Sequence, residues 1–192
     1  MDVAPDGRIF VCEQGGTLRV LQNGTLLAAP FATLATTAIS ERGLLGITLD
    51  PAFAGNGFVY VHYTAATHNR ISRLTAGPAN PNQMLAGREV ALVDLPDLVA
   101  TNHNGGALHF GPDGRLYAAV GNNAVNANSP SLTTVLGKML RYNPDGSIPP
   151  DNPLVSVSTF ATGLGSMRGL AFGTDGALYA LSDSQLQRIS LP

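Results

Sequence analysis

Residues 108–117 read LHFGPDGRLY, an apolar strand followed by an Asp-Gly turn and a second apolar strand that carries an aromatic residue. Successive side chains of a strand face opposite sides of a sheet, and Asp-Gly supplies the positive φ that a tight hairpin requires. The stretch therefore predicts a β-hairpin. Related patterns, with Asp-Gly or Asn-Gly at the turn, occur at residues 1–10, 47–60 and 170–179.

Repeats at a regular interval indicate a repeat architecture. The turn glycines are 50 to 62 residues apart, at or above the roughly 40 to 50 residues of a propeller blade. These glycines are Gly7, Gly57, Gly114 and Gly176. Each repeat also has a later strand with an arginine among apolar residues, and alternation there predicts one buried face and one solvent face. The arginine strands lie at residues 18–21, 71–74, 139–142 and 186–189.

We therefore predict an all-β fold, a β-propeller of four-stranded blades with about four repeat units, as one domain over residues 1–192. The expected units are residues 1–40, 41–98, 99–161 and 162–192. A β-sandwich with similar hairpins is the alternative fold. An open row of blades leaves strand edges uncovered. The chain therefore closes as a compact ring, forms part of a larger propeller or self-associates through its open edges.

The composition excludes several partners. The net charge is −2 and Lys138 is the single lysine, so no basic stripe can release counterions from nucleic acid. No apolar stretch reaches the roughly 18 residues of a membrane-spanning helix. We expect neither nucleic acid nor membrane as a partner. Cys12 is expected to be an apolar strand residue. Residues 1–7 lack the pattern of a signal peptide, so the protein stays inside the cell or its true start is missing.

Three motifs occur in an order that is typical of one family. They are residues 41–47, which read ERGLLGI, residues 102–114, which read NHNGGALHFGPDG, and residues 137–153, which read GKMLRYNPDGSIPPDNP. Together they resemble the soluble quinoprotein glucose dehydrogenases, aldose sugar dehydrogenases and sorbosone dehydrogenases. The resemblance covers nearly all of the chain.

This resemblance implies a six-bladed propeller, longer than this chain, with pyrroloquinoline quinone (PQQ) and calcium at the mouth of its central channel. It implies that an aldose is oxidised by hydride transfer to the quinone, and that the protein is periplasmic or secreted. His103 matches the family's catalytic base. Histidine suits proton abstraction near neutral pH, and the glycines that follow His103 allow a ligand to approach the backbone closely.

An alternative role for each histidine stays open at this stage. On residue type alone, His103 is a loop residue that hydrogen-bonds a neighbouring blade. His109 is expected to be a wall residue within its strand. His62 and His68 lack partners at a recognisable metal-ligand spacing.

Two residues outside these three motifs depart from the family pattern. Asn122 stands where the family usually has an aspartate beside the catalytic histidine, and an amide orients an imidazole without supplying charge. Gly165 stands where relatives have a cofactor-binding arginine. Arg168 is then the candidate for bonds to the quinone carboxylates. Asn122 and Arg168 are the predicted cofactor-binding residues.

The third departure concerns calcium. The resemblance implies a long calcium-binding loop after the strand at residues 178–182, and this sequence turns at once into its final strand. Asp183 and the asparagines between residues 122 and 128 offer oxygen ligands, but without the spacing of a calcium loop. We therefore predict no strong metal site.

Two functional hypotheses follow from these residues. The first is a PQQ-dependent sugar dehydrogenase in which His103 is the base. The second is a non-catalytic propeller, or a fragment, that binds a partner and has lost the quinone and calcium site. A shared fold does not decide between them.

Overall fold

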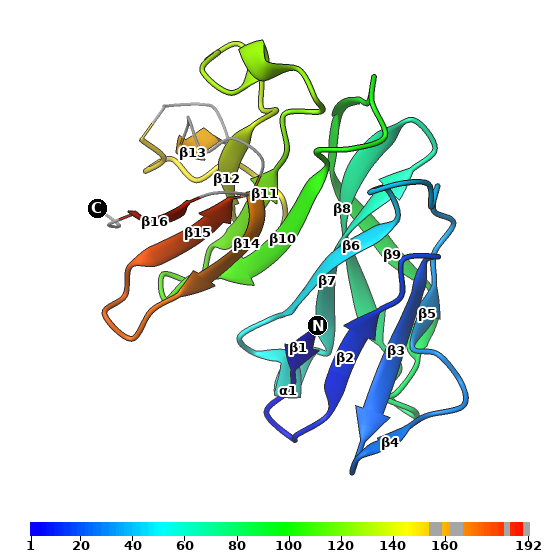
Figure 1. Cartoon of the computed structure of the whole chain (residues 1–192). Coiled ribbons are helices and arrows are strands. Elements are labelled where there is room, and N and C mark those ends of the chain that lie inside the picture. The colour runs from blue at the N-terminus through cyan, green and yellow to red at the C-terminus, as the bar shows by residue number, and fades with distance from the viewer. Residues whose placement is uncertain (154–158, 162–166, 183–184, 190–192) are drawn as a thin grey trace. The chain divides into compact units, whose positions relative to one another are not determined.

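The computed structural model describes residues 1–153, 159–161, 167–182 and 185–189. The chain separates into two compact units, Met1–Asp94 and Leu95–Pro192, and each unit has its own sheets. Nearly all regular structure in the described residues is β-strand (Figure 1). None of the helices among them is long and apolar enough to cross a membrane.

The first unit begins with a sheet of short antiparallel strands in the order β1-β2-β3-β4, and β5 also pairs with β3. Tight turns join these strands because positive φ angles occur at Gly7 between β1 and β2, and at Asn23 and Gly24 between β3 and β4. The strands are β1 (Asp2–Val3), β2 (Ile9–Cys12), β3 (Thr17–Gln22), β4 (Thr25–Leu26) and β5 (Ala32–Thr33).

The second sheet has the order β6-β7-β8-β9. One helical turn, α1, lies between β6 and β7 and ends at Gly57, whose φ of 65° is left-handed. The predicted hairpin around Gly57 is therefore present, with a longer connection than a two-residue turn. The elements are β6 (Leu44–Leu49), α1 (Phe53–Asn56), β7 (Phe58–Ala65), β8 (His68–Ala76) and β9 (Met84–Asp97).

Apolar side chains hold the two sheets of the first unit together. The fully buried Phe10 makes edge contacts with the rings of Phe31 and Phe53, at centroid distances of 5.4 and 5.6 Å. Such pairs stabilise a core beyond their burial alone. Asp2 adds a polar contact, because its carboxylate accepts a hydrogen bond from the backbone N–H of Leu49 at 2.8 Å.

The second unit contains a sheet of order β10-β11-β12-β13 and a sheet of described strands β14-β15-β16. Tyr117 in the first of these sheets and Phe172 in the second pack edge to face at 5.1 Å, within a cluster that includes Met139 and Leu178. The elements are β10 (Gly105–Phe110), β11 (Leu116–Val120), η1 (Asn126–Asn128), β12 (Lys138–Tyr142), β13 (Thr159–Ala161), β14 (Met167–Phe172), β15 (Leu178–Ser182) and β16 (Leu186–Ile189).

Each Asp-Gly hairpin is closed by its own aspartate. In the β10–β11 turn, Asp113 accepts a hydrogen bond from the backbone N–H of Arg115 at 3.1 Å. In the β14–β15 turn, Asp175 accepts from Ala177, also at 3.1 Å. The glycine that follows each aspartate has a positive φ, which a residue with a Cβ adopts only at a cost. The predicted hairpin chemistry is confirmed at both turns.

In the second unit, the same aspartates also explain why an arginine recurs in the third and fourth repeats. Tyr117 and Arg141 lie directly opposite each other in β11 and β12, and both donate to Asp113 Oδ2, at 3.0 and 2.8 Å. Burial raises the pKa of Tyr117, so its hydroxyl remains a donor. Tyr179 and Arg188 repeat the arrangement around Asp175. One carboxylate thus ties together three consecutive strands.

The predicted solvent face is wrong for β12, which is buried on both faces. Its Arg141 is 4% exposed. The guanidinium tolerates burial because Asp113 and Asp151 both form ion pairs with it, at 2.8 and 2.9 Å, and Asn152 accepts a further hydrogen bond.

Replacing Arg141 with alanine should destabilise the second unit by about 2–3 kcal/mol, because it removes the buried cation that Asp113 and Asp151 share. Arg188→Ala is the matched control, since the same aspartate–tyrosine–arginine arrangement is half-exposed there and exposed ion pairs contribute little. Urea unfolding of both variants measures the difference. Equal destabilisation by the two substitutions would contradict the role assigned to Arg141.

His62 makes the stability of the fold depend on pH. It is fully buried in β7, neither ring nitrogen has a hydrogen-bond partner, and burial lowers its pKa from 6.5 to about 4. The unfolded chain therefore takes up the proton more readily than the folded chain. The neutral ring is tolerated above pH 6.5, and stability is lost as the pH falls towards 4.

Between about pH 7.5 and about pH 4.5, the wild type should lose about 2.5 kcal/mol more stability than His62→Leu. Urea unfolding at the two pH values checks this prediction. The variant corrects for the carboxylates that also titrate in this range. Parallel losses in wild type and variant would show that His62 is not the titrating group.

Candidate functional site

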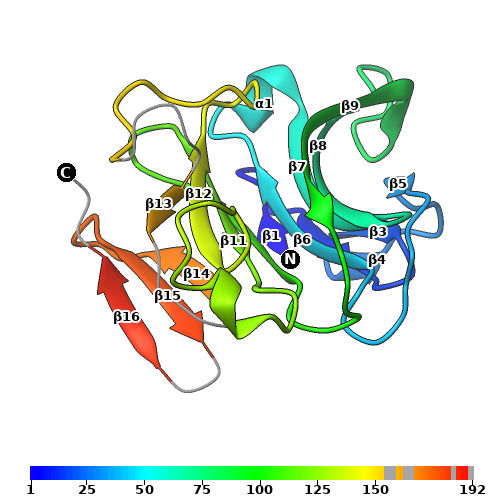
Figure 2. The same cartoon turned by 90° about the horizontal axis from the view of Figure 1, so that it is seen from above.

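Antiparallel pairing brings the predicted base and its neighbour to one end of a sheet. His103 precedes β10 and Asn122 follows β11, and Gly105 in β10 pairs with Val120 in β11. The chain segments before β10 and after β11 therefore meet. The loop at residues 121–137, which carries η1 and is drawn yellow-green, lies at this same end (Figure 1). Seen from above, it lies in front of β11 and β12 (Figure 2).

The glycines of this segment allow an unusually close approach of two backbones. A Cβ at Gly121 would overlap the carbonyl oxygen of His103, and a Cβ at Gly105 would lie 2.6 Å from the carbonyl oxygen of Ala119. His103 itself has a φ of 57°, a strained conformation for a residue with a side chain. Glycine is thus required at positions 105 and 121 by the backbone path that presents His103.

Asn122 fixes the orientation of the His103 ring. His103 Nδ1 lies 3.0 Å from Asn122 Oδ1, and the same Oδ1 accepts a hydrogen bond from the backbone N–H of Ala124 at 3.1 Å. A backbone N–H only donates, so the amide atom that faces His103 is the oxygen. His103 Nδ1 consequently carries the proton, and Nε2 carries the lone pair.

The remaining loop contacts hold Asn122 in place. Asn122 Nδ2 donates to Ser129 Oγ at 3.3 Å, and Asn128 Nδ2 donates to the Asn122 carbonyl at 3.0 Å. Asn123 is also engaged, because its N–H donates to the carbonyl of His103 and its Oδ1 accepts from Ala100. The asparagines that the sequence offered as cation ligands are therefore largely used within the loop.

Of the two predicted cofactor-binding residues, the structure describes the side chain of Asn122. Asn122 is 4% exposed and lies beside His103, where its amide oxygen orients the imidazole ring. Arg168 belongs to β14, and its side chain lies outside the described part of the chain, as do Gly165 and Asp183. In the described residues, no group of at least three histidine, cysteine, aspartate or glutamate side chains is placed to bind a metal ion.

The described residues around His103 do not by themselves form a site for a tricarboxylate such as PQQ. Lys138, the single lysine of the chain, follows this loop directly. It is fully buried, and its ammonium donates to backbone carbonyls. Arg141 is bound by Asp113 and Asp151. A quinone carboxylate would therefore need Arg168 or further chain segments as its cationic partner.

The other histidines have structural contacts. His109 lies 2.7 Å from the carbonyl of Phe110 through Nδ1 and packs against the Phe172 ring. His68 lies 3.1 Å from Asp94. Sequence reasoning missed Ser129 and the backbone N–H of Ala124, because hydroxyl and backbone groups carry no motif. Lys138 was visible in the sequence as the single lysine, but its role was not.

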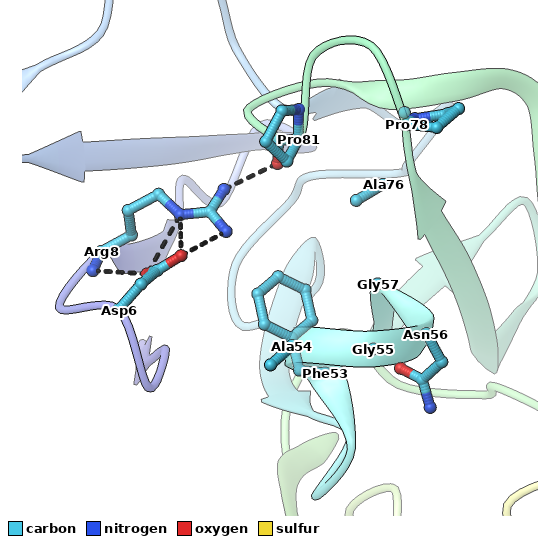
Figure 3. Close-up of a pocket in the computed structure, with 11 residues that line it drawn as sticks. Asp6, Arg8, Phe53, Ala54, Gly55, Asn56, Gly57, Ala76, Pro78 and Pro81 are labelled. Atoms are coloured by element: carbon cyan, nitrogen blue, oxygen red, sulfur yellow. Dashed lines mark hydrogen bonds and ion pairs between the residues drawn. The ribbon is translucent and has the colours of Figure 1, made fainter.

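A separate pocket of about 390 Å³ lies in the first unit, beside the β1–β2 turn, α1 and the segment after β8 (Figure 3). Its arginine, Arg8, is already engaged by Asp6 and by the carbonyl of Pro81, as the dashed lines show. Asn56 is held by Asp50, and most other lining residues are glycine, alanine, proline or phenylalanine. We assign no chemistry to this pocket.

Each sheet has antiparallel strands in chain order, as the blades of a β-propeller do. His103, held by Asn122 at the end of one sheet, is the candidate base. The family model for glucose/sorbosone dehydrogenase matches residues 1–183. The chain therefore belongs to the glucose/sorbosone dehydrogenase family, and the predicted propeller fold and family resemblance are confirmed.

Three relatives illustrate this similarity. Aldose sugar dehydrogenase YliI of Escherichia coli (strain K12) is 29% identical over 80% of this chain and 43% of its own length. Hedgehog-interacting protein of Mus musculus is 29% identical over 76% of this chain and 25% of its own length. The solved structure of the PQQ-bound form of aldose sugar dehydrogenase from Streptomyces coelicolor matches with a TM-score of 0.90 and 28% identity. That match covers 98% of this chain and 58% of the other. The chain thus spans less than half the length of these two curated relatives.

Gly121→Ala should displace the His103 loop, because the new methyl group would overlap the His103 carbonyl. We expect a loss of at least about 3 kcal/mol of unfolding free energy, or an unfolded chain. Gly169→Ala is the matched control, since a Cβ there meets nothing within 4 Å. Urea unfolding compares the two variants. A Gly121→Ala variant as stable as Gly169→Ala would show that the backbones do not approach as described.

Proposed function

We propose that this chain contributes the base of a sugar dehydrogenase site, at which the hydroxyl of an aldose is oxidised. His103 is the proposed catalytic residue. The observation that carries this proposal is the bond between His103 Nδ1 and an Asn122 amide whose orientation is set by Ala124. This arrangement leaves Nε2 as the basic nitrogen, in a half-buried ring at the end of a sheet.

The chemistry asked of His103 is proton removal from a sugar hydroxyl while the C–H electron pair leaves as hydride. An orienting partner on the far ring nitrogen is the usual way to hold a catalytic imidazole in the required tautomer. Asn122 performs this orientation. Because its amide is neutral, it does not stabilise the positive charge that the ring gains, which a carboxylate would do.

The hydride needs an acceptor, and family membership supports PQQ in that role. PQQ supplies a two-electron oxidant when it is bound. We propose Arg168 as a contact for its carboxylates, and calcium as the accompanying ion in the intact site. The described residues do not form that site alone, so we derive no step through the quinone. We also propose, from family membership, that the protein is periplasmic or secreted. Self-association through open sheet edges is a further proposal.

A second candidate function is a binding propeller without catalysis. Hedgehog-interacting protein, whose name describes an interaction, is as similar to this chain in percent identity as the aldose sugar dehydrogenase. The engagement of Lys138 by backbone carbonyls, which uses all three of its N–H donors, favours this alternative. It predicts that the chain binds no quinone.

The experiment titrates the purified chain with PQQ in the presence of calcium, and then measures dye reduction with aldoses. We expect saturable quinone binding and sugar-dependent reduction. His103→Gln should lower the reduction rate at least about 100-fold, since it removes the base, while quinone affinity changes by less than about threefold.

His109→Gln is the matched control, because it changes a histidine of the same sheet that makes only structural contacts, and its rate should stay near that of the wild type. An unaltered rate in His103→Gln would refute the assignment of the base. Absence of quinone binding at high micromolar concentration would support the binding propeller instead.

A further inference from the structure

Lys138, at the start of β12, is a buried cation that has no carboxylate partner among the residues that the structure describes. Its side chain is 0% exposed. Its ammonium donates to the backbone carbonyls of Asn128 at 2.6 Å, Leu136 at 2.8 Å and Ser129 at 3.0 Å. An ammonium has three N–H donors, and all of them are used. Burial lowers the pKa of this lysine, which shows that keeping its ammonium charged inside the loop costs desolvation free energy.

All of these carbonyls belong to the loop at residues 121–137. The backbone of Lys138 is fixed independently, because β12 pairs with β11 and Lys138 lies opposite Val120. The ammonium therefore fastens the two sides of the loop to a rigid sheet. Gly137 N–H, which donates to the Gly121 carbonyl at 2.9 Å, closes the base of the same loop.

Two hydrogen bonds connect Ser129, which Lys138 binds, to the His103 ring. Ser129, whose carbonyl accepts from Lys138, also receives the Asn122 amide N–H through its hydroxyl. Asn122 in turn bonds to His103 Nδ1. Asn128 provides a parallel link, since its carbonyl accepts from Lys138 and its side chain donates to the Asn122 carbonyl.

An apolar side chain at position 138 would fill the space but remove the donor from three carbonyls, of which that of Leu136 is buried and those of Asn128 and Ser129 are partly buried. Each unpaired group costs free energy, and the loop would relieve that cost by opening towards water. Opening would move Ser129 and Asn128 away from Asn122. The Asn122 amide would then lose its Ser129 partner and keep the bond from the Ala124 N–H, so the preference for a proton on His103 Nδ1 would weaken.

We propose that Lys138 is a positioning residue for His103: its ammonium holds the loop at residues 121–137 closed, and the closed loop keeps His103 in the Nδ1-protonated tautomer. The catalytic consequence rests on the proposed function. The positioning itself is a property of the free chain and needs neither quinone nor sugar.

The test is nitrogen NMR of the histidine rings in the ¹⁵N-labelled full chain, with His103→Gln used to assign the His103 signals. Wild type should show His103 protonated at Nδ1. In Lys138→Met, the His103 signals should shift towards a mixture of tautomers. His109 is an internal reference, because its Nδ1 bond to Phe110 lies outside the loop and should not change.

Unchanged His103 signals in Lys138→Met would overturn the proposal. A simultaneous change at His109 would also overturn it, because it would indicate a general structural role. If Lys138→Met does not fold, Ser129→Ala interrupts the same route one bond further on and leaves the ammonium in place. It should shift His103 alone, and an unchanged ring would again refute the route.

Turnover provides a separate readout. If the chain reduces dye with sugar, Lys138→Met should lower kcat at least about tenfold while KM for the sugar changes less than about twofold. Failure of the dye assay in the wild type would count against the proposed function alone. The NMR result decides the positioning role in either case.

Discussion

The second unit depends most on the aspartates of two Asp-Gly turns, Asp113 and Asp175. One carboxylate oxygen closes the turn by accepting a backbone N–H, and the other accepts from a tyrosine and an arginine on the next two strands. A single residue thus sets the turn, the register and the order of three strands. Because this contact recurs at Asp175, the sheets repeat even where their apolar residues differ.

The opposite end of the β10–β13 sheet is organised by different chemistry. Here the connecting loop is long, and amides, a serine and the Lys138 ammonium replace the aspartate. Glycines at 105 and 121 let the backbones approach so closely that His103 is held in a strained conformation. The candidate chemistry therefore gathers at the loop end of the sheet, where the side chains that hold the loop also contact His103.

Much of the fold was predictable because it depends on local patterns. Asp-Gly turns, alternating strands and the recurring arginine are readable in the sequence, and the hairpin at residues 108–117 is as predicted. The burial of Arg141 was not readable, since it requires Asp113 and Asp151 to converge from distant positions. His103 could be identified from its motif. The contributions of Ser129 and Ala124 could not, because neither belongs to a motif. Their role depends on the path of a loop that sequence periodicity does not describe.

Asparagine at position 122, where the family usually has aspartate, does not remove every contribution of that residue to the site. Orientation and charge stabilisation are separate tasks of the residue at position 122. Asn122 retains the first, because its oxygen faces His103 and its N–H reaches Ser129. A hydroxyl both donates and accepts, so Ser129 suits an amide as well as the aspartate that the family usually has. Asn122 therefore does not by itself distinguish an enzyme from a binding propeller. That distinction rests on whether the chain offers a cation to the quinone carboxylates, since Lys138 and Arg141 are already committed to the fold.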